Sequence, residues 1–145
     1  MAYKGKYQPS HPRKYKGDPT NIIFRSLWER KFMIYCDKNS NILEWNSEEI
    51  AIPYISPVDG KPHRYFPDFY MKVKETNGQI KRYVIEVKPL KQCSPPKKPK
   101  RQTPGYIREA YEYAKNQAKW KEAREWCADR QLEFKVVTEK ELGIK

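Results

Sequence analysis

Two carboxylates and a lysine occur in this chain at a spacing that suits metal-assisted cleavage of a phosphodiester bond. Asp68 follows Pro67, and Glu86 stands two residues before Lys88. Because side chains two apart on a strand share one face, a strand through this run points Glu86 and Lys88 in the same direction. Carboxylate oxygens suit Mg²⁺ or Mn²⁺, which activates a water, while a lysine holds or polarises that water. These three residues form the candidate site.

The turn between Asp68 and Glu86 fixes which residues face each other. A three-residue loop at Thr76-Asn77-Gly78, with its glycine in the left-handed conformation, pairs Phe69 with Ile85. This register keeps apolar side chains opposite one another, whereas a two-residue turn would pair them with charged ones. It also sets Asp68 opposite Glu86. Because opposed like charges cost free energy, a nearby cation must compensate them, and the metal and the lysine would do so.

The surroundings of the Glu86 motif distinguish it from similar triplets elsewhere. Glu29-x-Lys31, Asp59-x-Lys61 and Glu133-x-Lys135 have the same acid-x-lysine spacing. Only Glu86-x-Lys88 follows the apolar run Tyr83-Val84-Ile85 and is joined by a turn to the single Pro-Asp pair in the sequence.

Each candidate also has a plain structural interpretation. Glu29 completes the capping box Ser26-Leu-Trp-Glu29, so it either caps a helix or assists the site as a fourth acid. Asp68 has the alternative of a polar residue on a solvent face. Glu86 and Lys88 have the alternative of a surface ion pair, which contributes little to stability.

The elements around these residues predict an α/β fold in which helices flank a mixed β-sheet. Capping boxes begin helices at Ser26 and Thr138, and apolar runs bounded by turn residues predict strands. The expected helices cover residues 26–38, 105–130 and a short segment after 138, and the expected strands cover 42–45, 50–55, 64–74, 80–88 and 132–137. Residues 26–145 are therefore expected to form a single domain.

Composition favours a nucleic-acid partner and excludes several other classes. The chain has 145 residues, 38% apolar and 14% aromatic, and a net charge of +12. This charge predicts a polyanionic partner, with nucleic acid ahead of a membrane surface. No apolar run is long enough for a transmembrane span. Three widely spaced cysteines argue against a disulfide framework and favour a reducing cytosol.

Two basic segments are candidates for DNA binding. Residues 1–25 mix basic side chains with rings at Tyr3, Tyr7, His11 and Tyr15, which predicts an N-terminal arm that follows phosphates, or else a solubilising tail. Residues 89–104 hold five prolines and five cations without an acid, which predicts a basic loop. The predicted DNA-binding residues are Lys4, Lys6, Arg13, Lys14, Lys16, Lys97, Lys98, Lys100, Arg101 and Lys119.

The same residues resemble a known superfamily. Asp68, Glu86-x-Lys88 and the helix acid Glu29 are similar to the PD-(D/E)xK nucleases. Longer blocks resemble the head completion nucleases of T4-like bacteriophages: the opening Met-Ala-Tyr-x-Gly-Lys, Arg25-Ser-x-Trp-Glu29, Ile52-Pro-Tyr54, Arg64-Tyr-Phe66, Ile85-Glu-Val-Lys-Pro89 and Asn116-x-x-Lys-Trp-Lys121. A transposon end-cleaving endonuclease subunit shares parts of this pattern.

The resemblance implies a restriction-endonuclease-like core that cleaves DNA with Mg²⁺ or Mn²⁺. By position, Asp68, Glu86 and the backbone carbonyl of Val87 would be metal ligands, Lys88 the catalytic lysine and Glu29 a supporting acid. It further implies action in phage head completion after DNA packaging. The partners would then be capsid or portal proteins, and the location the infected host's cytoplasm or the virion.

Further functional alternatives stay open at this stage. With no sequence-reading element evident, contacts mainly to phosphate favour selection of branched or end DNA by shape. A homodimer would place two sites on two strands, whereas a monomer would nick. The rival functions are a DNA-binding structural head-completion protein that no longer cuts and a recombination or repair nuclease.

Overall fold

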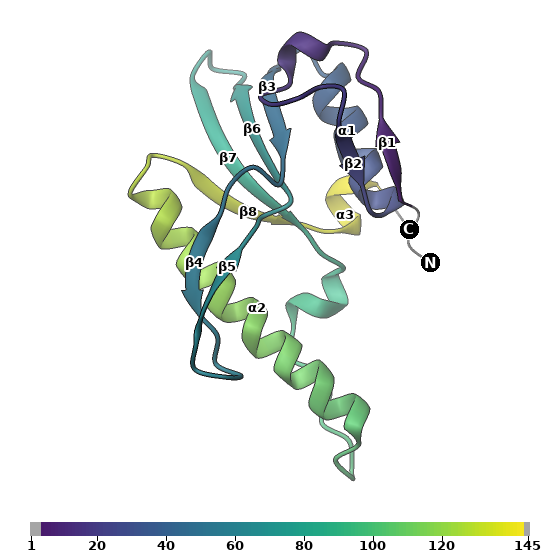
Figure 1. The fold of residues 1–145 in the computed structure, drawn as a ribbon, viewed down its shortest axis with the longest axis vertical. Coiled ribbons are helices and arrows are strands. Elements are labelled where there is room, and N and C mark those ends of the chain that lie inside the picture. Colours follow the sequence, from purple (N-terminus) through teal and green to yellow (C-terminus); the bar gives the residue numbers. More distant parts are fainter. Residues whose placement is uncertain (1–3, 144–145) are drawn as a thin grey trace.

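A four-stranded mixed sheet forms the centre of the molecule in the computed structural model, which describes residues 4–143. The strand order is β3 (Ile42–Ser47), β6 (Phe69–Lys74), β7 (Ile80–Val87) and β8 (Glu133–Val137). The first three strands are antiparallel, and β8 runs parallel to β7. This parallel pair needs a long crossover, which contains helix α2 (Pro104–Ala128) (Figure 1). The predicted restriction-endonuclease-like α/β fold is confirmed.

The hairpin between β6 and β7 has the predicted register. Phe69 pairs with Ile85, and Gly78 has a φ of +86°. The Glu75 N–H donates to the carbonyl of Gln79 at 2.7 Å, which closes a three-residue loop. Because Gly has no Cβ, it takes this left-handed conformation without steric cost.

The two faces of the sheet are covered by different helices. Helix α1 (Leu27–Lys38) packs on the face that carries Phe69 and Ile85. Helix α2 covers the other face, where Tyr70 and Val84 pack with Cys127. Since side chains alternate along β7, the next residue to point toward the α2 face after Val84 is Glu86.

The predicted long strand over 64–74 is wrong, because the chain is broken at Pro67. Residues before the break form β5 (Pro62–Tyr65), which pairs with β4 (Ile52–Ile55) in a separate two-stranded ribbon. Residues after it form β6 in the main sheet. Pro67 is fully buried and has no N–H for a ladder, so it suits this transition.

Residues 4–25 are part of the fold, which corrects the prediction of an arm over residues 1–25 for the part that the structure describes. β1 (Gly5–Tyr7) pairs with β2 (Ile22–Phe24), and the short helix η1 (Pro12–Lys14) lies between them. Tyr7 and Tyr15 are buried in the core beside α1, so their rings cannot stack on bases. The high charge of this stretch suggested an exposed segment, although its two buried tyrosines anchor it to the core. Tyr3 lies outside the described residues.

A buried carboxylate holds the N-terminal segment against α1. Asp37 accepts hydrogen bonds from the Tyr7 hydroxyl at 2.6 Å, the Ser10 N–H at 2.7 Å and the His11 N–H at 2.9 Å. Burial works to raise the pKa of Asp37, but these hydrogen bonds outweigh it and the pKa lies below its ordinary value. Lys14 Nζ donates to the Asp37 carbonyl at 2.9 Å.

The remaining elements surround the end of β7. The basic loop contains a short helix, η2 (Leu90–Cys93), and leads into α2. After β8 the predicted capping box begins α3 (Glu139–Leu142), and Glu139 accepts a hydrogen bond from the Leu90 N–H at 2.7 Å. Within residues 4–143, no helix combines the length and apolar character needed to cross a membrane.

Replacing Asp37 by Ala is expected to lower the free energy of unfolding by about 3 kcal/mol, because it removes the charged acceptor of the buried Tyr7 hydroxyl and of two part-buried backbone N–H groups. Tyr7→Phe removes one donor and should cost about 1 kcal/mol. Urea unfolding of both variants measures these losses. Unchanged stability of Asp37→Ala would contradict an anchored N-terminal segment.

Candidate active site

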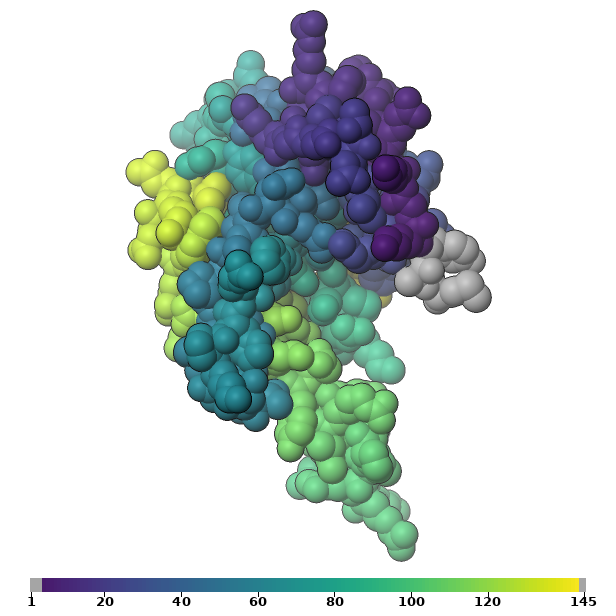
Figure 2. All heavy atoms as spheres, in the orientation of Figure 1, coloured from purple at the N-terminus to yellow at the C-terminus, as the bar shows by residue number. Residues whose placement is uncertain are grey.

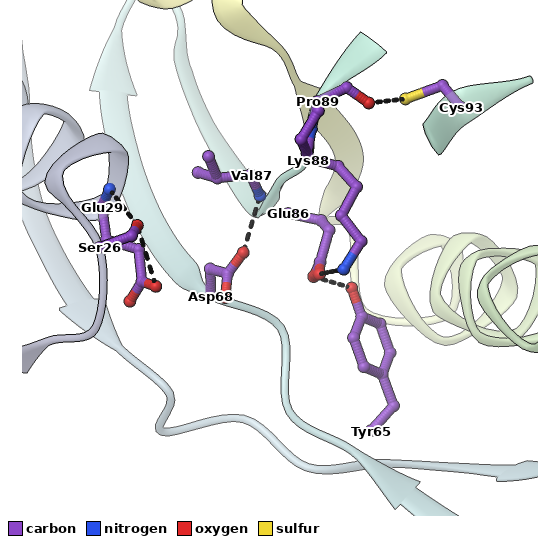
Figure 3. Close-up of polar contacts among 9 residues, drawn as sticks. All are labelled: Ser26, Glu29, Tyr65, Asp68, Glu86, Val87, Lys88, Pro89 and Cys93. Atoms are coloured by element: carbon purple, nitrogen blue, oxygen red, sulfur yellow. Dashed lines mark hydrogen bonds and ion pairs between the residues drawn. The ribbon is translucent and has the colours of Figure 1, made fainter. Parts of the chain in front are cut away.

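A cleft of about 500 Å³ opens at the end of β7, between the start of α1 and η2. It gathers the residues that the sequence pattern singled out, from three separate elements (Figure 3). The lining residues are Ser26, Leu27, Trp28, Glu29, Asp68, Glu86, Val87, Lys88, Pro89 and Gln92. The structure therefore brings the predicted catalytic set together.

Glu86 and Lys88 lie side by side, as their strand spacing predicts. Lys88 Nζ is 3.9 Å from Glu86 Oε1. Glu86 is only 7% exposed, since its side chain points toward α2 at the end of a buried strand. The pair is thus a largely buried arrangement, which excludes the alternative of a surface ion pair.

Asp68 reaches the site by a route slightly different from the one predicted. The ladder between β6 and β7 begins at Phe69 and Ile85, so Asp68 lies just beyond it. Its Oδ2 accepts a hydrogen bond from the Val87 N–H at 2.8 Å. The Asp68 carboxylate is consequently fixed against the end of β7, next to Glu86.

The environment of the site disfavours the charged forms of both acids. Burial, followed by the Glu86 carboxylate, raises the pKa of Asp68 well above its ordinary value. Burial also raises the pKa of Glu86, although Tyr65 and Lys88 work in the opposite direction. Two neighbouring acids whose pKa values are both raised, one buried and one half-buried, mark a place where a bound cation would be stabilised.

Tyr65 is a site residue that the search for acids and lysines missed. It lies at the end of β5, is 4% exposed, and its hydroxyl donates to Glu86 Oε2 at 2.5 Å. Burial, and then the Glu86 carboxylate, raises the pKa of Tyr65, so the phenol keeps its proton. The sequence feature that could have identified Tyr65 is its position three residues before Asp68, on the other side of Pro67. Figure 3 shows the Tyr65 hydroxyl and the Lys88 ammonium converging on Glu86.

Lys119 also lies close to this group. Its Nζ is 5.5 Å from the centre of the Tyr65 ring and 5.8 Å from that of Tyr54. Burial, followed by the charge of Lys115, lowers the pKa of Lys119. Lys119 therefore lies beside the site on α2, and its role in DNA binding stays a prediction.

Glu29 combines the two functions that the sequence left as alternatives. Its backbone N–H donates to the Ser26 hydroxyl at 3.1 Å, which caps α1. Its half-buried carboxylate accepts from the same hydroxyl at 3.4 Å and lines the cleft. Burial raises the pKa of this carboxyl group as well.

The predicted DNA-binding cations fall into two groups. Lys14 is a structural residue, because its ammonium donates to the carbonyls of Asp37 and Asn39 near the end of α1. The others apart from Lys119 are exposed and stay predictions: Lys4, Lys6, Arg13, Lys16, Lys97, Lys98, Lys100 and Arg101.

The donor set can hold one kind of metal better than others. In the described part of the chain, no cluster of three or more His, Cys, Asp or Glu forms a metal site. Asp68 Oδ1 and Glu86 Oε1 are the carboxylate oxygens left by the hydrogen bonds above. Two carboxylates with room for waters suit Mg²⁺ or Mn²⁺ and do not suit tetrahedral Zn²⁺.

Comparison with known proteins agrees with this geometry. The TnsA-like endonuclease N-terminal family matches residues 39–139, which include Asp68, Glu86 and Lys88. The head completion nuclease of Enterobacteria phage T4 is 40% identical over an aligned span of 152 residues, which covers 100% of this chain and 99% of that protein. The resemblance inferred from sequence blocks is confirmed, and the chain belongs to the TnsA-like endonuclease family.

Proposed function

We propose that this protein is a divalent-metal-dependent endonuclease that hydrolyses phosphodiester bonds in DNA. The observation that carries the proposal is the pair of carboxylates, half-buried Asp68 and buried Glu86, that line one cleft beside Lys88. Membership of an endonuclease family and a net charge of +12 support it.

Asp68 and Glu86 would hold Mg²⁺ or Mn²⁺, with the carbonyl of Val87 as a further ligand. When bound, the metal supplies charge neutralisation at the scissile phosphate and a more acidic water. Lys88 places a positive charge beside Glu86, where it orients a water or stabilises charge developing on the phosphate. Glu29 lies across the cleft, where its carboxylate would act as a supporting acid.

The biological setting that we propose is completion of the phage head after DNA packaging. Support comes from the T4 relative, whose name describes a head completion nuclease and whose similarity spans the whole chain. Branched or end DNA is the proposed substrate, and capsid or portal proteins are the proposed partners. A homodimer would cut both strands.

Replacing Glu86 by Gln or Lys88 by Ala is expected to reduce metal-dependent DNA cleavage at least about 100-fold, because each removes a group that acts on the reacting phosphate or its metal. Binding in the presence of chelator should stay within a few-fold, since phosphate contacts dominate affinity. Gel assays on branched and linear DNA with Mg²⁺ or Mn²⁺ measure this.

The matched control is the acid-x-lysine triplet on the neighbouring strand β8. Glu133→Gln with Lys135→Ala repeats the same chemical changes outside the cleft. It should leave cleavage unchanged. Tight binding without cleavage by the wild type under either metal would support the DNA-binding structural role instead.

Without metal, stability is expected to fall as pH rises from about 5 to about 8. Asp68 and Glu86 have raised pKa values when folded, so the folded state holds more protons than the unfolded state in this window. Asp68→Asn should therefore stabilise the metal-free protein at the upper end and abolish stabilisation by Mg²⁺. Thermal unfolding with and without Mg²⁺ tests both statements. Equal stabilisation of wild type and variant by Mg²⁺ would place the metal elsewhere.

Removing the Tyr65 hydroxyl should weaken metal binding about 10- to 100-fold, because Tyr65→Phe frees the Glu86 oxygen that the hydroxyl positions. The dependence of cleavage on Mn²⁺ concentration and direct titration of Mn²⁺ binding both report this change. Tyr70→Phe, which removes a hydroxyl bonded to Glu44 on the same face of the sheet, is the control. Identical Mn²⁺ affinity for Tyr65→Phe and wild type would refute a positioning role.

A further inference from the structure

A narrow projection extends from the domain below the candidate active site. We call residues 94–115 the finger, which consists of the end of the basic loop and the first half of α2. Every residue from 87 to 115 is exposed or half-buried, and the buried residues of α2 begin at Asn116. Figure 1 shows this half of α2 continuing past the sheet and the β4–β5 ribbon, and Figure 2 shows the same segment standing out from the body.

The finger presents a concentration of positive charge at its tip. Residues 94–108 of the finger contain five Lys or Arg and no Asp or Glu, and residues 109–115 add Lys115 and the acids Glu109 and Glu112. Lys97, Lys98, Lys100 and Arg101 are exposed, and within residues 4–143 none of them makes an ion pair. Unpaired cations on a projecting loop repel one another, so the arrangement favours a polyanion and suits a phosphate backbone.

The finger adjoins the candidate active site. A groove of about 860 Å³ runs between the basic loop and α2. The charged residues of its lining are Lys91, Lys97 and Arg108 together with Glu109 and Glu112 on α2. Gln92 lines both this groove and the cleft that holds Glu86. A nucleic acid seated in the cleft therefore has a direct path onto the finger.

The helix sets the reach of this path. Lys119 lies beside Tyr65 and hence beside Glu86, whereas Pro104 begins α2 fifteen residues earlier. A rise of 1.5 Å per residue gives a separation of about 22 Å between these points. A B-form duplex lying along α2 advances 3.4 Å per base pair, so the start of α2, next to the tip, lies about six or seven base pairs from Lys119 at the candidate site.

We propose that the finger is a duplex-gripping arm that contacts DNA phosphates six or seven base pairs to one side of the cleavage site. This inference rests on the proposed DNA cleavage and adds a substrate requirement to it: a stretch of duplex on the finger side of the cut. Contacts to phosphate make the requirement one of length and not of sequence.

The test measures affinity for linear duplexes of graded length in the presence of chelator, so that no cleavage is needed. The variant carries Lys97→Ala, Lys98→Ala, Lys100→Ala and Arg101→Ala. For wild type, affinity should rise with length until the whole footprint is filled. For the variant, the plateau should come about six or seven base pairs earlier, and the slope of log affinity against log salt should be shallower by about two to four.

The control variant removes the same number of cations far from the cleft, where α1 ends and the β6–β7 hairpin turns: Lys38, Lys72, Lys74 and Lys81, each replaced by Ala. It should keep the wild-type plateau and slope. An unchanged plateau in the finger variant would overturn the proposal and assign the finger to a protein partner. Equal loss at every length would also overturn it, because the cations would then act inside the minimal footprint. Absence of cleavage by wild type would refute the nuclease while leaving this binding result interpretable.

Discussion

The burial of Glu86 at the end of β7 determines which other groups the site must contain. A carboxylate in a largely dry position needs a hydrogen-bond donor and a nearby positive charge. The fold provides the Tyr65 hydroxyl at 2.5 Å and the Lys88 ammonium at 3.9 Å. Tyr65 can reach Glu86 only because the chain leaves the β4–β5 ribbon at Pro67 before entering β6. The same break carries Asp68 to the Val87 N–H. One backbone transition thus positions two of the residues around the buried acid.

The second side of the cleft depends on a different buried acid. Asp37, near the end of α1, ties the N-terminal segment to the helix through Tyr7 and two backbone N–H groups. The helix begins at Ser26, where the Glu29 N–H completes the cap and turns the Glu29 carboxylate toward the cleft. Hydrogen bonds therefore fix both ends of α1. The same cap that stabilises the start of this helix also positions the Glu29 carboxylate at the cleft.

Local patterns predicted the sheet and the acid–acid–lysine site because each depends on residues near in sequence. Apolar pairing chose the hairpin register, and strand periodicity placed Glu86 and Lys88 together. The errors arose where a distant partner decides the outcome. Asp37 accepts a hydrogen bond from Tyr7, thirty positions earlier, and no local pattern in the basic N-terminal segment predicts this contact. Tyr65 matters only through Glu86, twenty-one positions later. Pro67 could be identified in the sequence as a residue that interrupts a strand. That the residues before it pair with β4 in a separate ribbon depends on contacts that the local sequence does not show.

We propose that Asp68 and Glu86 together hold a divalent metal. The measurement to make is diffraction from crystals grown with Mn²⁺, using the anomalous signal of the metal. A single strong peak, or a close pair, is expected between the Asp68 and Glu86 carboxylates and near the Val87 carbonyl. A peak bound elsewhere, or no peak in the cleft when Mn²⁺ supports cleavage, would contradict it.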